Sequence, residues 1–301
     1  MKRFIIGNSL KDEALIVLKV GLKLAKQVKH RATVIHSDRL ADFDSLDTIF
    51  NQLNMEVKQQ YIDNIITSNN LMLKEQIQSI GDDFEEFEYF SRSGTADDIL
   101  IKEARDSDVE LVVLGHNANK TWSEKFLGGV TESVLHRCEK SVLVVKDEKL
   151  LNPKKILLAY DFSYHCDEAL NWAKMIKSEA GIELHLVNVL PCYYEGYYLT
   201  HQMQDNFNEL MEKNITEGVD KVNKRLAEVR DDFPEQDNII CKTILDKEGS
   251  VSSKLADYCD EHEIDLIVMG SHKRGKIGDF VLGSVASKVL KKVKTNILIA
   301  K

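Results

Sequence analysis

The strongest constraint on the fold of this 301-residue chain is that it contains the same segment twice. Residues 94–146 align without a gap onto residues 249–301, at an offset of 155 residues. Glycines and apolar residues recur at matching positions, for example Gly115 with Gly270 and Leu111 with Leu266. A period of this length indicates a duplicated domain, because solenoid repeats are far shorter.

The two halves also correspond at their amino-terminal ends, where Phe4–Ser9 parallels Ile156–Ser163. Between the halves, the stretch 149–154 is polar on both flanks and holds one of only three prolines, which is typical of a short linker. We therefore expect two domains, at residues 1–148 and 153–301. Each is long enough to bury a core without disulfides or metal ions.

Each half alternates short apolar runs with amphipathic segments. The predicted strands of the first half are 3–8, 32–37, 86–91, 109–114 and 141–146, and those of the second are 155–161, 183–189, 239–245, 264–269 and 296–300. The predicted helices of the second half are 167–178, 203–230, 250–261 and 281–293. This alternation predicts an α/β fold of two tandem Rossmann-like domains, each a five-stranded parallel sheet flanked by helices.

Composition narrows the class of protein. The net charge of −9 argues against a broad nucleic-acid-binding surface, and no apolar run approaches the roughly 20 residues of a membrane helix. The start of the chain lacks the long apolar region of a signal peptide. The five cysteines include no C-x-x-C pair, which favours reduced thiols and a cytoplasmic location.

The loop after the fourth strand of the second half carries the strongest chemical signal. It runs from Gly270 into a helix expected from about Phe280, with Gly283 and Ser284 in the first turn. Glycines let backbone N–H groups approach a phosphate, and the helix N-terminus adds partial positive charge. The hydroxyl of Ser284 and the amine of Lys273 are further donors.

Three interpretations of this loop stay open. It is a nucleotide loop, a Walker A loop, or a glycine-rich turn that only closes the corner between strand and helix. The Walker A pattern fits Gly270 and Gly275-Lys276, but Ile277 stands where that motif needs Ser or Thr for magnesium.

The spacing of Gly270 and Gly283-Ser284 resembles the loop of the universal stress protein family, except that Lys273 replaces the second glycine. The resemblance extends over both halves. It implies an adenine nucleotide alpha hydrolase-like fold and a role in stress adaptation. It also implies binding of ATP or another adenine nucleotide, with or without Mg²⁺.

The resemblance carries residue roles with it. Asp161 would lie by the ribose and phosphates, Val189 would meet adenine, and the glycines with Ser284 would hold phosphates. The candidate binding residues are Asp161, Val189, Gly270, Lys273, Gly283, Ser284 and Val285.

The first half has lost parts of this pattern. Asn8 stands where the family has an acid, Ala118 and Gly129 replace a glycine and the Ser/Thr, and Trp122 and Phe126 occupy the loop. We therefore expect no ATP binding in the family manner there.

The first half would instead serve as a pairing partner. By the resemblance, Val142–Val145 and Ile297–Ala300 would pair the halves as an internal pseudo-dimer, and the whole chain could form a homodimer. A regulatory protein partner is expected, but the sequence does not name it.

Other readings are a ligand-free interaction scaffold and a weak ATP-hydrolysing enzyme; no catalytic residue is assigned. His36 and His116 end two strands of the first half, where a metal site competes with ordinary polar histidines. Cys166, after His165, opens a helix whose N-terminus could lower the thiol pKa, although a packing role is favoured.

Overall fold

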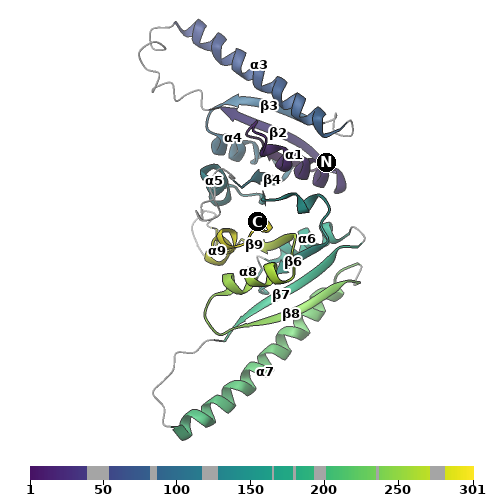
Figure 1. The fold of residues 1–301 in the computed structure, drawn as a ribbon, viewed down its shortest axis with the longest axis vertical. Coiled ribbons are helices and arrows are strands. Elements are labelled where there is room, and N and C mark those ends of the chain that lie inside the picture. Colours follow the sequence, from purple (N-terminus) through teal and green to yellow (C-terminus); the bar gives the residue numbers. More distant parts are fainter. Residues whose placement is uncertain are drawn as a thin grey trace. The chain divides into compact units, whose positions relative to one another are not determined.

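The computed structural model of the 301-residue chain describes residues 1–38, 54–81, 87–116, 128–164, 166–178, 181–192, 201–234, 237–271 and 282–301. Side chains of residues 201–211 are not described. The chain forms two compact units, which divide between Asn152 and Pro153. Each unit has the same architecture (Figure 1).

The first unit is a parallel sheet of five strands in the order β3-β2-β1-β4-β5. The strands are β1 (Arg3–Gly7), β2 (Arg31–Asp38), β3 (Glu88–Ser93), β4 (Val109–Gly115) and β5 (Ser141–Val145). The helices are α1 (Ala14–Gln27), α3 (Met55–Ile80), α4 (Ala96–Glu103) and α5 (Gly129–Arg137), with a 3₁₀ turn, η3 (Glu148–Leu151), after the last strand.

The second unit repeats this topology in the order β10-β9-β6-β7-β8, again with parallel strands. Its strands are β6 (Lys155–Ala159), β7 (Glu183–Pro191), β8 (Ile239–Asp246), β9 (Leu266–Gly270) and β10 (Asn296–Ala300). Its helices are α6 (Cys166–Lys177), α7 (His201–Asp231), α8 (Val251–Glu261) and α9 (Ser284–Lys292).

The predicted fold class is therefore confirmed, and the strand ends differ from the prediction by a few residues. Among the helices, α9 was predicted over 281–293 and begins at Ser284. Gly283 lies outside the helix as its N-cap, in extended geometry with φ −59° and ψ 151°. The pairing of Val142–Val145 with Ile297–Ala300 stays a prediction.

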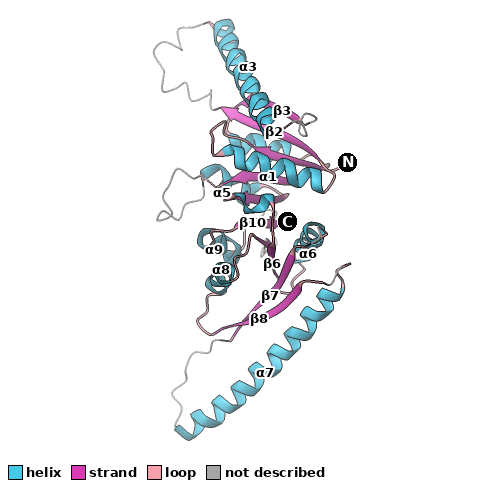
Figure 2. Ribbon diagram, turned by 45° about the vertical axis from the view of Figure 1, so that its right-hand side comes forward, coloured by secondary structure: helices cyan, strands magenta, loops and turns pink. Residues whose placement is uncertain are grey.

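Helices cover both faces of each sheet. In the second unit, α6 lies on one face, while α8 and α9 pack together on the other (Figure 2). The central strands are apolar throughout, as both faces are covered: Phe4, Ile5 and Ile6 in β1 are all 0% exposed. In the described part of the chain, no helix is both long and apolar enough to cross a membrane.

Each sheet has a point where strand order reverses. In the first unit it lies between β1 and β4, and in the second between β6 and β9. The crevice outside the carboxyl ends of these strands is where open α/β sheets bind ligands. The loops that follow β1, β4, β6 and β9 are therefore the places to look for a site.

A buried histidine lies at the opposite, amino-terminal end of β7. His185 is 2% exposed, with Nδ1 2.8 Å from the Tyr258 hydroxyl and Nε2 2.7 Å from Glu183 Oε1. Burial raises the pKa of Tyr258 to about 12, so the phenol stays protonated and donates to Nδ1. Burial also lowers the pKa of His185, against the opposing effect of Glu183.

We expect this histidine to make the protein less stable in mild acid. Because the folded-state pKa of His185 lies below the unfolded value of about 6.5, the unfolded chain binds the extra proton more readily. The free energy of unfolding should fall as the pH drops below about 6.5. Urea titrations across that range should show a shallower fall in His185→Gln, and equal slopes would contradict the assignment.

Candidate functional site

The residue after the first strand is tied to the second strand in the same way in both halves. Asn8 donates its backbone N–H to the carbonyl of Ile35 at 2.9 Å. Tyr160 does the same to the carbonyl of Val187 at 2.8 Å. Asn8 and Tyr160 therefore occupy equivalent positions.

A side chain of the second strand then holds the carbonyl of that residue. His36 donates Nδ1–H to the Asn8 carbonyl at 2.8 Å, and Asn188 donates Nδ2–H to the Tyr160 carbonyl at 2.8 Å. The two side chains differ, but each is buried and each satisfies a backbone acceptor. The corner after the first strand thus has one shape in both halves.

This register corrects the sequence alignment at one position. Ser9, not Asn8, is equivalent to Asp161, so the prediction that Asn8 replaces the acid was wrong by one residue. The error has a physical origin, because both side chains cap a turn two residues ahead. Asn8 Oδ1 accepts from Leu10 N at 2.7 Å, and Asp161 Oδ1 accepts from Ser163 N at 2.9 Å.

The next residue in each half has left-handed backbone geometry. Leu10 has φ 61° and the equivalent Phe162 has φ 62°, values that side chains of this size rarely adopt. Phe162 is held in place on both sides. Its ring meets Tyr160 edge-on at 5.3 Å between centroids, and the Arg225 guanidinium lies 3.9 Å over it.

Asp161 itself is exposed and oriented by two donors. Besides Ser163 N, the thiol of Cys166 lies 3.1 Å from Asp161 Oδ1 and donates to it. Cys166 is 3% exposed, and burial raises its pKa to about 12. The alternative of a low-pKa thiol is therefore wrong, and Cys166 acts through packing and its contact with Asp161. His165 lies outside the described residues.

Both halves place a glycine at the start of the helix that follows the fourth strand. Gly283 accepts the first helical hydrogen bond of α9 from Ser287 N at 2.9 Å, and Gly128 accepts that of α5 from Glu132 N at 2.9 Å. Within the described residues, neither N-cap is closed by a side chain. The N–H groups in the first turn of a helix have no carbonyl partner within the helix, and they are the groups that bind anions at helix N-termini. Ser284, in that turn of α9, is exposed.

The described candidate residues of the second half lie at one edge of its sheet. Asp161 follows β6, Val189 lies near the end of β7, and Gly270 ends β9; these three strands are neighbours. Lys273 lies outside the described residues, as do the alternative Walker residues Gly275 and Lys276. The roles assigned to all of these residues stay predictions.

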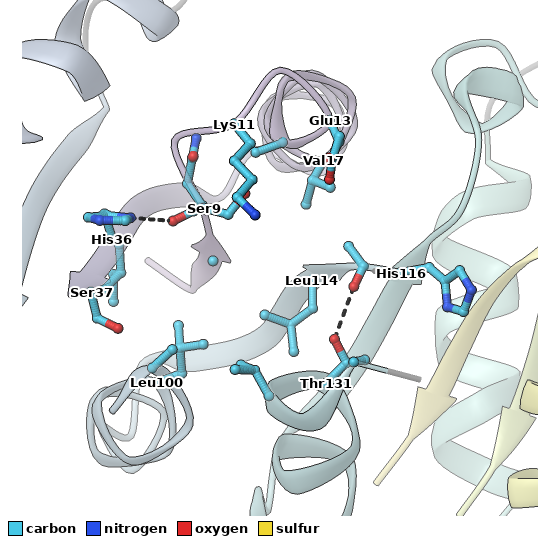
Figure 3. Close-up of a pocket in the computed structure, with 18 of the residues that line it drawn as sticks. Ser9, Lys11, Glu13, Val17, His36, Ser37, Leu100, Leu114, His116 and Thr131 are labelled. Atoms are coloured by element: carbon cyan, nitrogen blue, oxygen red, sulfur yellow. Dashed lines mark hydrogen bonds between the residues drawn. The ribbon is translucent and has the colours of Figure 1, made fainter. Parts of the chain in front are cut away.

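A pocket occupies the corresponding place in the first half. It has a volume of about 390 Å³ and lies among the carboxyl ends of β1, β2 and β4 and the start of α5 (Figure 3). By the register above, six of its lining residues are the equivalents of Asp161, Val189, Gly270, Gly283, Ser284 and Val285: they are Ser9, Ser37, Gly115, Gly128, Gly129 and Val130.

Sequence reasoning missed this pocket, because it judged the first half by the loss of motif residues. The cavity depends on backbone positions that are shared with the second half. The equivalence Gly115–Gly270 and Gly128–Gly283 in the repeat was the one signal that could have indicated it. Ala118, Trp122 and Phe126 lie outside the described residues.

The two histidines of the first half flank the pocket. His36 directs Nδ1 to the Asn8 carbonyl and has Nε2 3.4 Å from Asp38 Oδ1, so both ring nitrogens face protein oxygens. Burial, followed by the charge of Lys146, lowers the pKa of His116. Among the described residues, no three His, Cys, Asp or Glu side chains cluster as a metal site requires.

Comparison with known proteins identifies the family. The sequence model of the universal stress protein family matches residues 1–146 and again residues 152–301. The chain belongs to the universal stress protein family. It is a tandem member, with two copies of the family domain in one chain.

Individual relatives agree with this assignment. A universal stress protein from Methanocaldococcus jannaschii is 27% identical over 160 residues, which are 49% of this chain and 94% of the relative. A universal stress protein A homolog from Haemophilus influenzae is 29% identical over 144 residues, or 48% of this chain and 95% of the relative. Each relative therefore corresponds to about half of this tandem universal stress protein.

The fold extends over the whole chain in solved structures of similar length. A universal stress protein from Archaeoglobus fulgidus superposes with a TM-score of 0.61 at 19% identity, covering 99% of this chain and 98% of that one. A functionally unknown protein from Pseudomonas aeruginosa gives a TM-score of 0.60 at 14% identity, covering 100% of this chain and 92% of that one. These likenesses concern the fold alone.

Proposed function

We propose that this universal stress protein acts in stress adaptation by binding an adenine nucleotide, such as ATP, in its second half. The observation that carries the proposal is the equivalence between the two halves. Six candidate residues of the second half hold the same register positions as six residues that line one cavity in the first. A crevice at this edge suits a nucleotide, because it lies at the switch point of the sheet.

The chemistry of the described residues supports this ligand. The first turn of α9 and the Ser284 hydroxyl provide hydrogen-bond donors for phosphate oxygens. Asp161 provides an oriented acceptor for ribose hydroxyls. Mg²⁺, if it accompanies the nucleotide, would find one carboxylate there and take its remaining ligands from phosphates and water.

The proposal extends to location and partners. We place the protein in the cytoplasm, because its five cysteines are free thiols and the cytosol keeps thiols reduced. A nucleotide-dependent change in contacts with a regulatory protein would complete the role. Pairing of the halves through their last strands, or of two whole chains, would belong to the same assembly.

Calorimetry on the full chain tests nucleotide binding, with ATP, ADP and AMP each measured with and without Mg²⁺. Gly283→Val keeps a backbone geometry open to any residue but blocks close approach of a phosphate. Asp161→Asn keeps the acceptor for Ser163 and removes the charge. We expect each variant to weaken binding about tenfold or more, because each removes charge-assisted or backbone contacts. Asp167→Asn, on the exposed surface of α6, is the matched control.

The outcomes separate the alternatives. If the unmodified chain bound no nucleotide at millimolar concentration, the proposal would be overturned and a ligand-free scaffold favoured. Equal affinity in the control and in both site variants would place the nucleotide elsewhere. Steady release of ADP that Asp161→Ala abolishes would make the protein a weak ATPase.

A further inference from the structure

The pocket of the first half has an apolar floor and a polar rim. Its floor includes Val17, Leu100 and Leu114, each about 4% exposed, from α1, α4 and β4. Their side chains turn toward a common space (Figure 3). A floor of this kind accommodates the apolar body of a small organic molecule.

One polar atom on the wall has no partner. The Ser37 hydroxyl oxygen, on β2, is buried and makes no hydrogen bond to any part of the chain that the structure describes. An unsatisfied buried hydroxyl costs free energy, so such groups in folded proteins generally meet water or a ligand. Its equivalent in the second half is Val189, which has no hydroxyl, so this feature belongs to the first half alone.

A cation faces the same space. Lys11 lies in the loop between β1 and α1, and its amino group points toward the pocket (Figure 3). Among the described residues, it has no carboxylate within ion-pair distance. The first turn of α5 also lines the pocket, through Gly129 and Val130, and the helix N-terminus adds partial positive charge there.

The carboxylates of the rim are differently placed. Asp38 accepts a hydrogen bond from Asn69 Nδ2 at 2.5 Å, and its side chain is 39% exposed. Glu13 is exposed at the beginning of α1. At the position of Asp161 the first half has Ser9, a neutral donor. The first half therefore lacks the carboxylate that could hold a metal ion at the position of Asp161, and a ligand there can bind without one.

We propose that the pocket of the first half is a second ligand site, which binds a small phosphate monoester with an apolar body and needs no divalent cation. Lys11, Ser9 and the first turn of α5 hold the phosphate, while the ester group lies on Val17 and Leu114. Ser37 donates to a polar atom of the ligand. This site lies in the other half of the chain from the proposed nucleotide site, and it uses Ser9 where that site uses the carboxylate of Asp161.

The test uses calorimetry on the full chain with phenyl phosphate as the probe, in the presence of EDTA. Inorganic phosphate and phenol, measured separately, report the contributions of head group and body. Lys11→Ala removes the cation, and Lys19→Ala, an exposed lysine of the same helix region, is the control. Gly129→Leu adds a bulky side chain at a residue that lines the pocket, and a Cβ there meets no atom within 4 Å, so the change should not disturb the packing.

We expect saturable binding of phenyl phosphate, at least about tenfold weaker in Lys11→Ala, lost in Gly129→Leu and unchanged in Lys19→Ala. Inorganic phosphate and phenol should each bind more weakly than the ester. Gly283→Val should leave phenyl phosphate binding intact, and Gly129→Leu should leave ATP binding intact, so each site can fail without the other.

Three results would overturn the inference. The first is a lack of saturable binding at millimolar phenyl phosphate, and the second is binding that requires Mg²⁺. The third is an affinity for phenyl phosphate that falls in Gly283→Val but not in Gly129→Leu. Circular dichroism of Gly129→Leu separates a filled pocket from an unfolded chain, and Lys11→Ala tests the site without changing its packing.

Discussion

Replacing Trp172 with alanine should lower the free energy of unfolding by about 3–5 kcal/mol, the usual cost of removing a buried aromatic side chain. Trp172 is 1% exposed on α6, the helix that packs against β6, β9 and β10. The cavity left behind would lie among strands that cannot move inward, because they are hydrogen-bonded within the sheet. Urea denaturation followed by circular dichroism measures the change.

Tyr164→Ala is the control for this substitution. Tyr164 lies two residues before α6 and is 83% exposed, so its loss should change stability by less than about 0.5 kcal/mol. A loss below about 1 kcal/mol in Trp172→Ala would mean that the surrounding core collapses onto the vacated space, contrary to the near-complete burial of this side chain.

Asp265→Ala should cost about 2–3 kcal/mol, because it leaves two backbone donors at the start of β6 without their partner. Asp265 Oδ2 accepts from Lys154 N at 2.7 Å and from Lys155 N at 3.0 Å, and the residue is 9% exposed. Hydrogen bonds to a charged acceptor are the stronger kind. The carboxylate therefore anchors the chain where it enters the second sheet.

Asp265→Asn, which keeps one acceptor oxygen, should recover part of this loss in urea denaturation. Asp260→Ala, on the exposed side of α8, should change little. If Asp265→Ala proved as stable as the Asp260 control, water would be replacing the carboxylate at both amides.

Much of the fold could be predicted from the sequence, because local signals and topology agree. Runs such as Leu266–Met269 are too short and too apolar for exposed helices, and their alternation with amphipathic segments leaves a parallel sheet as the simplest outcome. Helix starts were harder. The N–H groups in the first turn of any helix have no helical carbonyl before them to bond to. The sequence pattern of the helix therefore does not fix its first residue, as at the start of α9.

The site was predictable only in part. The spacing of Gly270 and Gly283 pointed to the carboxyl-terminal edge of the sheet, where the ends of neighbouring parallel strands meet. The match of Asn8 to Asp161 failed because two side chains one residue apart form similar local turns. The pocket of the first half was missed because no single residue type marks a cavity.

The corner after the first strand has a consequence for how such a duplicated protein can diverge. Two features set the path of the backbone at this corner: the left-handed residue (Leu10 or Phe162) and the buried side chain of the second strand that donates to a carbonyl of the corner (His36 or Asn188). Neither feature involves the position of Ser9 and Asp161. Ser9 and Asp161 can therefore differ in charge while the chain around them keeps its path. Gene duplication would then allow one copy to change its ligand by single substitutions, with the other copy retaining the ancestral preference.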